Sequence, residues 1–281
     1  MNIAAALNAA SSRLSEPDIP EHRREASGLL ALTLQQPQVF LIAHPEYELT
    51  TAEQGKFEAF ITRRVNREPF HYITGHKEFF GLDFEVTPDV LIPRPETEIL
   101  VEAAIEILRK CDNPNFCEIG VGSGCISISI LHVIENASGI GVDVAENALT
   151  VARRNAEKHL VKERLNLKQA DILSGVTGTF DLIVSNPPYI PLGDITTLQV
   201  DVRDFEPRIA LNGGTSGLDL IGRIIRESPE HLVTQGVLLM EIGFGQFEKV
   251  CELFDKAAWN PPDFLPDLQG IPRIVKAQAS S

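Results

Sequence analysis

The sequence predicts an α/β fold that follows a small all-helical domain. Residues 1–75 carry only helical patterns, whereas short apolar strands alternate with amphipathic helices from residue 115 onward. Such alternation is typical of a mostly parallel sheet that is covered by helices on both faces. The length of 281 residues also suits two domains better than one.

The composition is that of an ordinary globular protein, with 43% hydrophobic and 23% charged residues and a net charge of −14. This acidic balance argues against stable nucleic-acid binding, which needs a basic surface. No apolar run approaches the length of a membrane span, and no basic leader precedes one, so we expect a cytoplasmic protein without a membrane partner. The four cysteines show neither disulfide nor metal-ligand spacing, so we expect reduced thiols and no metal site.

Residues 1–75 predict a helical domain. An alanine-rich stretch at 3–14 has helical spacing of its leucines, and Pro20 stands at a tolerated first-turn position of a second helix. Thr50 followed by Glu53 is a capping-box arrangement at the start of a third helix. No motif in this domain carries evident chemistry.

A linker at 76–93 separates the two predicted domains. The segment 68–75 is expected to break the helix before it, and short apolar runs on either side of Gly81 indicate a hairpin. Two prolines then flank Arg94 and hold the chain extended until an amphipathic helix begins at Glu96.

Residues 94–281 form the predicted α/β domain. Its strands are expected at 116–119, 138–143, 165–169, 180–185 and 236–241, with a final edge hairpin within 263–276. Its helices are expected at 125–134, 145–158, 217–226 and 246–257. Open sheets of this class bind their ligands at the carboxyl ends of the strands.

A glycine-rich loop follows the first of these strands. It consists of Gly120, Val121, Gly122, Ser123 and Gly124, and the acid Glu118 precedes it. Glycines let the backbone turn tightly and approach a ligand below a helix N-terminus, and Asp143 at the end of the next strand suits a ribose diol. Dinucleotide enzymes have the spacing G-x-G-x-x-G around a pyrophosphate, whereas this loop is G-x-G-x-G. The spacing therefore favours S-adenosylmethionine, which has an amino-acid moiety and an adenosine but no pyrophosphate.

Asp171 and Ile172 follow the third strand of the domain. In one interpretation Asp171 accepts a hydrogen bond from the adenine amino group while Ile172 packs on the ring. In the other, Asp171 is only a turn or helix-capping residue. The sequence does not decide between the two.

The fourth strand stops at Asn186-Pro187-Pro188-Tyr189, because two consecutive prolines donate no backbone N–H groups. The side-chain carbonyl of Asn186 and the backbone carbonyl of Pro187 can both accept from one planar NH2 group, with Tyr189 as a flat wall. An amide nitrogen is a poor nucleophile, and holding both of its hydrogens orients it and disperses the developing positive charge. Taken alone, the motif is equally compatible with a proline-stiffened turn.

The chain resembles the HemK/PrmC family of protein-(glutamine-N5) methyltransferases over nearly its whole length. The matching motifs lie at 68–75, 90–98, 120–124, 181–190, 206–214 and 267–273. The most particular of them are the linker sequence 92–98 and the stretch 206–214. The resemblance implies a Rossmann-like class I methyltransferase domain with a seven-stranded, mostly parallel sheet at 94–281. It also implies that residues 1–75 dock the substrate.

Members of this family transfer a methyl group from S-adenosylmethionine to the glutamine of the Gly-Gly-Gln motif in class I peptide chain release factors. The product of the cofactor is S-adenosylhomocysteine. The resemblance implies that the cofactor is held by Glu118, the loop Gly120–Gly124, Asp143, Asp171, Ile172 and Asn186. It implies that the substrate is held by Arg94, Glu96, Asn186, Pro187, Pro188 and Tyr189, with Asn186, Pro187 and Tyr189 as the catalytic residues. A monomer is expected.

Two positions depart from the family pattern. Glu118 stands where an aspartate is usual, and Thr215-Ser216 stands where an Asp-Gly pair is more usual. Three other hypotheses stay open. The same transfer to a ribosomal or other protein is disfavoured by the linker sequence, and transfer to adenine in DNA is disfavoured by the net charge of −14. The third hypothesis is a cofactor-binding scaffold without activity. It is disfavoured because the pair of acceptors on Asn186 and Pro187, the Asn186 corner, would then have no purpose.

Overall fold

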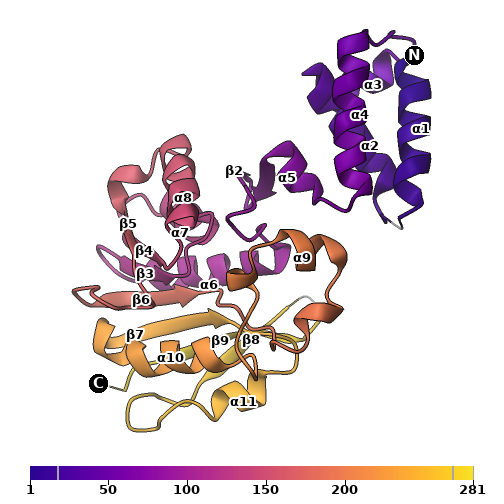
Figure 1. Cartoon of the computed structure of the whole chain (residues 1–281). Coiled ribbons are helices and arrows are strands. Elements are labelled where there is room, and N and C mark those ends of the chain that lie inside the picture. Colours follow the sequence, from indigo (N-terminus) through magenta and orange to yellow (C-terminus); the bar gives the residue numbers. More distant parts are fainter. Residues whose placement is uncertain (18, 268, 281) are drawn as a thin grey trace. The chain divides into compact units, whose positions relative to one another are not determined.

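The structure, a computed structural model, describes residues 1–17, 19–267 and 269–280. Its contacts divide the chain into two compact units. Figure 1 shows the helices and strands of the chain, coloured by position in the sequence. One unit holds residues 1–76 and 199–205, and the other holds 77–198 and 206–281. The predicted boundary placed all of 94–281 in one domain, so the short segment 199–205 is a difference from the sequence prediction.

The described part of the first unit is helical. Its helices are α1 (Ile3–Ser15), α2 (His22–Leu34), α3 (Gln38–Ala43), α4 (Thr51–Val65), α5 (Phe70–Thr74) and α9 (Val200–Phe205). The predicted capping box at the start of α4 is confirmed, because the Glu53 carboxylate accepts the Thr50 N–H (2.7 Å) while the Thr50 hydroxyl accepts the Glu53 N–H (3.2 Å). Apolar faces of α1, α2 and α4 pack into one core around Leu14, Leu29 and Phe57.

Three short helices of this unit were not predicted, namely α3, α5 and α9. α3 and α5 begin directly after Pro37 and Pro69, where the missing proline N–H is not needed by the helix. The segment 68–75 therefore ends α4, as expected, but then forms a helical turn of its own before Gly75.

Charged groups explain why residues 199–205 belong to the helical unit. Asp201 on α9 accepts from Arg64 (2.9 Å), in the last turn of α4, and from Arg67 (2.5 Å), which follows that helix. The Arg64 side chain is only 5% exposed and also pairs with Glu25. A buried guanidinium without a paired carboxylate is strongly unfavourable, so the ion pair between Arg64 and Asp201 holds α9 against the other helices of this unit.

The described residues of the second unit form two sheets, one of which begins at His76, the last residue of the first unit's range 1–76. A hairpin of β1 (His76–Phe79) and β2 (Leu82–Glu85) turns at Gly81, as the sequence predicts. The larger, seven-stranded sheet has the order β5-β4-β3-β6-β7-β9-β8. Its strands are β3 (Asn115–Ile119), β4 (Ser138–Asp143), β5 (Leu165–Gln169), β6 (Phe180–Ser185), β7 (Leu232–Glu241), β8 (Asp263–Pro266) and β9 (Pro272–Gln278).

The first five of these strands are parallel, and β9 pairs antiparallel with β7 and with β8. The predicted strands and the predicted edge hairpin at the end of the chain are thus confirmed. β7 begins at Leu232, four residues before the predicted start at 236, and α11 (Phe247–Cys251) ends well before the predicted residue 257.

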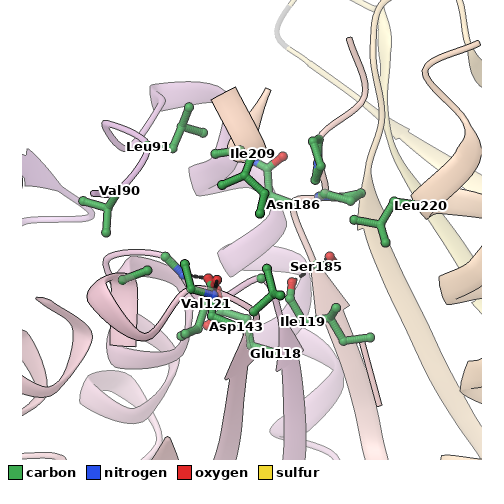
Figure 2. A pocket seen from close by; sticks show the side chains of 18 of the residues that line it. Val90, Leu91, Glu118, Ile119, Val121, Asp143, Ser185, Asn186, Ile209 and Leu220 are labelled. Atoms are coloured by element: carbon green, nitrogen blue, oxygen red, sulfur yellow. Dashed lines mark hydrogen bonds between the residues drawn. The ribbon is translucent and has the colours of Figure 1, made fainter. Parts of the chain in front are cut away.

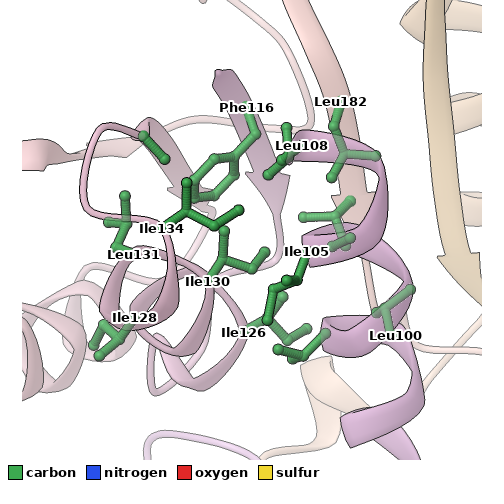
Figure 3. Close-up of a cluster of buried hydrophobic side chains, with 14 of the residues drawn as sticks. Leu100, Ile105, Leu108, Phe116, Ile126, Ile128, Ile130, Leu131, Ile134 and Leu182 are labelled. Carbon is green, nitrogen blue, oxygen red and sulfur yellow. The ribbon is translucent and has the colours of Figure 1, made fainter. Parts of the chain in front are cut away.

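Helices cover both faces of the sheet because its side chains alternate between them. In β6, Leu182 and Val184 belong to one apolar cluster, and Ile183 belongs to the other. The first cluster includes side chains of α6 (Glu98–Leu108) and α7 (Cys125–Val133), and Figure 3 shows part of it around Phe116. The second cluster includes side chains of α10 (Asp219–Glu227) and α11. α8 (Glu146–Lys158) connects β4 to β5.

Among the described residues, no helix is both long and apolar enough to cross a membrane.

Candidate active site

A cavity of about 530 Å³ opens at the carboxyl edge of the large sheet, and all its lining residues belong to the second unit. It lies where β3 and β6 adjoin. The strand order reverses direction at this point, since β4 and β5 follow on one side of β3 and β7 follows on the far side of β6. Open α/β sheets bind ligands at this switch point, and the volume suits a small molecule. Figure 2 shows side chains from several strand ends around it, among them Glu118, Asp143 and Asn186.

The glycine loop between β3 and α7 forms one wall. Gly120, Gly122 and Gly124 have left-handed backbone conformations, with φ of 75°, 53° and 82°. A Cβ atom at Gly124 would lie 2.8 Å from Ile128 Cδ1, so the end of that side chain would have to shift to admit it. The Gly120 N–H donates to the Val142 carbonyl of β4 (2.8 Å), which ties the loop to the neighbouring strand.

Asp143 at the end of β4 braces the same loop. One carboxylate oxygen accepts the Gly122 N–H (2.9 Å) and the other accepts the Ala145 N–H (2.9 Å). Burial raises the pKa of the Asp143 carboxyl above its ordinary value, and these N–H groups oppose that rise. Each oxygen retains capacity to accept from a ligand hydroxyl. The geometry therefore suits a diol.

Glu118 lies on the cavity wall but is only 1% exposed. One of its oxygens accepts from both the backbone N–H (2.9 Å) and the hydroxyl of Ser127 in the first turn of α7. Burial raises the pKa of the Glu118 carboxyl to about 8, and the Ser127 hydrogen bonds oppose this. A cationic ligand group next to Glu118 would favour its ionised form.

Asp171 and Ile172 also line the cavity. Both oxygens of Asp171 accept from the guanidinium of Arg223 (3.1 and 3.0 Å), and its backbone carbonyl accepts the Ser174 N–H in a turn (3.1 Å). Ile172 is 4% exposed and has a left-handed backbone with φ of 54°. The carboxylate thus has a partner within the protein, which favours the turn interpretation of Asp171.

Asn186, Pro187 and Pro188 form the opposite wall, and the loop that holds them is braced by the segment 206–214. A parallel bridge joins Ile190 to Asn212, and the Gly213 N–H donates to the Ile190 carbonyl (2.9 Å). Gly213 lies so close that a Cβ atom there would be 2.8 Å from the Pro188 carbonyl oxygen and from Tyr189 Cα. Only glycine fits between these backbones.

Side chains from three separate segments meet behind Asn186. Its Nδ2 donates to Thr97 Oγ1 (3.0 Å), and Thr97 Oγ1 donates to Glu241 Oε2 (2.7 Å). Thr97 ends the short 3-10 turn η1 (Pro95–Thr97), and Glu241 ends β7 beside β6. Thr97 and Glu241 are 2% and 4% exposed. Burial raises the pKa of the Glu241 carboxyl, and the Thr97 hydrogen bond opposes this.

Tyr189 does not line the cavity, so its ring does not form the predicted wall in this structure. The ring packs against the apolar cluster that includes α10 and α11, and the hydroxyl lies 3.4 Å from Glu241 Oε1. That distance marks a weak hydrogen bond. Burial and the nearby Glu241 carboxyl raise the pKa of Tyr189 to about 12, so its hydroxyl is a neutral donor.

Arg94 and Glu96 have different positions. Arg94 lines the cavity, and its Nη2 lies 2.7 and 2.8 Å from the two carboxylate oxygens of Glu206. Glu206 is buried, with a side chain only 1% exposed. Glu96 is exposed and does not line the cavity.

The cavity brings together most residues that the sequence singled out. Those that line it are Arg94, Glu118, Gly120, Val121, Gly122, Ser123, Asp143, Asp171, Ile172, Asn186, Pro187 and Pro188. Sequence reasoning missed Thr97, Arg223 and Glu241. One signal was available for Glu241, because a carboxylate at the end of an apolar strand needs a buried partner.

Family models match both parts of the chain. The model described as the PrmC N-terminal domain matches residues 5–75, and the methyltransferase small domain matches residues 96–200. A solved methyltransferase structure from Pyrococcus furiosus aligns with a TM-score of 0.55 at 21% identity, over 80% of this chain and 98% of that one. The predicted Rossmann-like methyltransferase fold is therefore confirmed.

Two relatives that match nearly the whole chain have the same name. A release factor glutamine methyltransferase of Koribacter versatilis is 39% identical over 277 residues, which cover 98% of each chain. A relative of the same name from Geobacter sulfurreducens is 40% identical over 93% of this chain and 91% of its own. At this identity and coverage, the chain belongs to the family of release factor glutamine methyltransferases, as its resemblance to the HemK/PrmC proteins implied.

Proposed function

We propose that this protein transfers a methyl group from S-adenosylmethionine to the glutamine side-chain nitrogen in the Gly-Gly-Gln motif of class I release factors. One observation carries the proposal. A single cavity is lined both by the glycine loop with Asp143 and by the Asn186-Pro187 corner. A cofactor site and an NH2-holding site thus share one enclosed space, and relatives named for this reaction match the whole chain.

The residues on the glycine-loop side fit the proposed cofactor. The left-handed glycines leave open backbone beside the ligand, and Asp143 suits the ribose hydroxyls. Glu118 is available to the cationic amino group, and Ile172 offers an apolar surface near the adenine. When bound, S-adenosylmethionine supplies an electrophilic methyl group. We assign no direct cofactor contact to Asp171, because Arg223 holds its carboxylate.

The residues on the Asn186 side fit a planar amide. The Nδ2 of Asn186 is used by Thr97, so its Oδ1 is the polar atom left for a ligand. This oxygen and the Pro187 carbonyl can accept both hydrogens of one NH2 group, which orients the nitrogen lone pair and stabilises positive charge on the nitrogen. Catalysis then depends on placement.

The proposal is tested by mass spectrometry of an unmodified release factor after incubation with the protein and S-adenosylmethionine. We expect one added methyl group on the Gly-Gly-Gln glutamine. Asn186→Ala should abolish this gain but keep the cofactor-dependent thermal shift. Asn136→Ala is the matched control, because Asn136 is exposed and does not line the cavity. No gain with the wild-type protein, despite cofactor binding, would reject the substrate, and full activity of Asn186→Ala would reject the pocket.

We propose further that the helical unit binds the release factor away from the modified glutamine. Two apolar side chains of α3 support this, since Val39 is 66% and Ile42 is 80% exposed. Ile42→Ser should raise KM for an intact release factor and leave KM for a short Gly-Gly-Gln peptide unchanged. An equal rise for both substrates would contradict a docking role.

A further inference from the structure

The hydrogen bonds behind Asn186 run in one direction. The Asn186 NH2 donates to the Thr97 hydroxyl (3.0 Å), and that hydroxyl donates to the Glu241 carboxylate (2.7 Å). The three residues come from the loop after β6, from η1 and from the end of β7. Neither Thr97 nor Glu241 was among the predicted site residues, and Glu241 does not line the cavity.

The proton inventory of these groups explains the direction. A threonine hydroxyl has one proton, and an ionised carboxylate can only accept. Because Thr97 gives its proton to Glu241, its oxygen is left as an acceptor for Asn186. If the Asn186 amide were turned by 180°, its Oδ1 would face an oxygen that has no proton to offer, in a site where both Thr97 and Glu241 are buried. Such an unpaired arrangement is unfavourable in the interior.

We infer that Thr97 and Glu241 are positioning residues for the reaction: they hold the Asn186 amide so that Oδ1 is presented to the substrate nitrogen. This inference rests on the proposed function, because only an NH2-bearing substrate needs an acceptor there. A turned amide would present its NH2 group to the substrate NH2 group, and two donors repel. We call the chain of hydrogen bonds from Asn186 through Thr97 to Glu241 the relay. It selects the one orientation of the Asn186 amide that can hold the substrate.

Tyr189 has a smaller part in this relay. Its hydroxyl is 3.4 Å from Glu241, compared with 2.7 Å for Thr97, so the stronger hold on the carboxylate is that of Thr97. Thr97 is also the only one of the two in contact with Asn186 among the described hydrogen bonds. The decisive atom is thus the Thr97 hydroxyl.

The test compares Thr97→Val with Thr97→Ser. Valine has the shape of threonine but no hydroxyl, whereas serine keeps the hydroxyl and loses a methyl group. We expect Thr97→Val to lower kcat for methyl transfer by about ten- to a hundredfold, the scale of a misplaced reacting group, with Kd for S-adenosylmethionine unchanged. Thr97→Ser should restore most of the turnover.

A second readout does not depend on turnover. In protein labelled with ¹⁵N at asparagine, the Asn186 NH2 protons should exchange slowly with water in the wild-type protein and in Thr97→Ser, but rapidly in Thr97→Val. Asn186→Ala identifies the signal by its loss. The inference is overturned if Thr97→Val keeps both slow exchange and wild-type kcat. It is equally overturned if Thr97→Ser loses as much kcat as Thr97→Val, since packing would then be the cause.

Glu241→Leu carries the test if Thr97→Val does not fold. Leucine cannot accept the Thr97 proton, so the hydroxyl is free to donate to Asn186 Oδ1 and to reverse the relay, and kcat should fall by about three- to tenfold with cofactor Kd unchanged. An unchanged kcat would reject the relay. The wild-type protein separates the two levels of the proposal, because its failure to methylate a release factor rejects the function, whereas wild-type kcat in both the wild-type protein and the variants rejects only the relay.

Discussion

The two walls of the cavity are built by different means. On the glycine-loop wall, backbone N–H groups of the loop contact groups at the end of the adjacent strand, such as the Gly122 N–H that donates to the Asp143 carboxylate, 21 positions away. On the Asn186 wall, the main contacts join side chains that are far apart in the sequence. Asn186 and Thr97 are separated by 89 positions, and Thr97 and Glu241 are separated by 144. The first wall is thus specified by a local motif, and the second is specified only by the folded domain.

This difference separates two kinds of effect. Changes on the glycine-loop wall should act on cofactor affinity, because that wall shapes the cofactor site. Changes on the Asn186 wall should act on turnover, because that wall orients the reacting nitrogen.

The largest effect is expected at Gly213, which supports the Asn186 wall. In Gly213→Ala the new Cβ atom would lie 2.8 Å from the Pro188 carbonyl and from Tyr189 Cα, so the loop that carries Asn186 must move. A shift of about 1 Å in a catalytic group costs roughly a hundredfold in rate. We expect a loss of that size in kcat, with Kd for S-adenosylmethionine within about threefold of wild type by calorimetry.

Gly222→Ala is the matched control. The new Cβ atom would meet only Leu253 Cδ1 at 3.8 Å, and the site is inside helix α10. Alanine favours a helix over glycine by about 1 kcal/mol, so this variant should be slightly more stable and fully active. A comparable loss of kcat in both variants would show that the effect of Gly213→Ala is not local.

The second prediction concerns Asp143 on the other wall. Asp143→Ala removes two acceptors that hold the N–H groups of Gly122 and Ala145. The same carboxylate is the proposed acceptor for the ribose hydroxyls. Hydrogen bonds to charged groups contribute about 1.5–3 kcal/mol, and a loss of this size in the binding free energy of the cofactor raises its Kd by about ten- to a hundredfold. At saturating cofactor, kcat should stay within about threefold of wild type. A large fall in kcat with unchanged Kd would contradict the separation of the two walls.

The same contrast explains how much the sequence could predict. The strands, the edge hairpin and the glycine loop follow from period and spacing, which are local properties of the chain. Asn186 and Pro187 were recognisable because prolines mark the end of a strand. Thr97 and Glu241 were not recognised, because a partner 144 positions away has no signature in spacing. For the same reason no local signal indicated that residues 199–205 group with the helical unit, since only the folded chain brings Asp201 to Arg64.

The third prediction uses the pKa of Glu118. This pKa is raised from 4.5 to about 8 by burial, so the folded state binds the proton more tightly than the unfolded chain does. The resulting stability is fully present below the ordinary pKa and is lost as the pH rises through about 8. Glu118→Gln cannot ionise. Between pH 5 and pH 8.5, the free energy of unfolding of the wild-type protein should therefore fall by about 1–3 kcal/mol more than that of the variant.

Urea unfolding of both proteins at a series of pH values measures this difference. Parallel curves for wild type and Glu118→Gln would show that Glu118 ionises normally in the folded protein. Addition of S-adenosylmethionine should reduce the difference between the curves, because its cationic amino group stabilises the ionised carboxylate.

The smallest effect is expected at Asp171, although it lines the cavity on the cofactor side. Its carboxylate pairs with Arg223 at an exposed position, with side chains 58% and 40% exposed, and such pairs contribute less than about 1 kcal/mol. Asp171→Asn should therefore change the midpoint of thermal unfolding only slightly and leave Kd for the cofactor within about threefold. A tenfold weaker Kd would instead show that Asp171 contacts the adenine directly. The glycine-loop wall would then include a second side chain as decisive for affinity as Asp143, and it would depend on a residue outside the local motif of the loop and the next strand end.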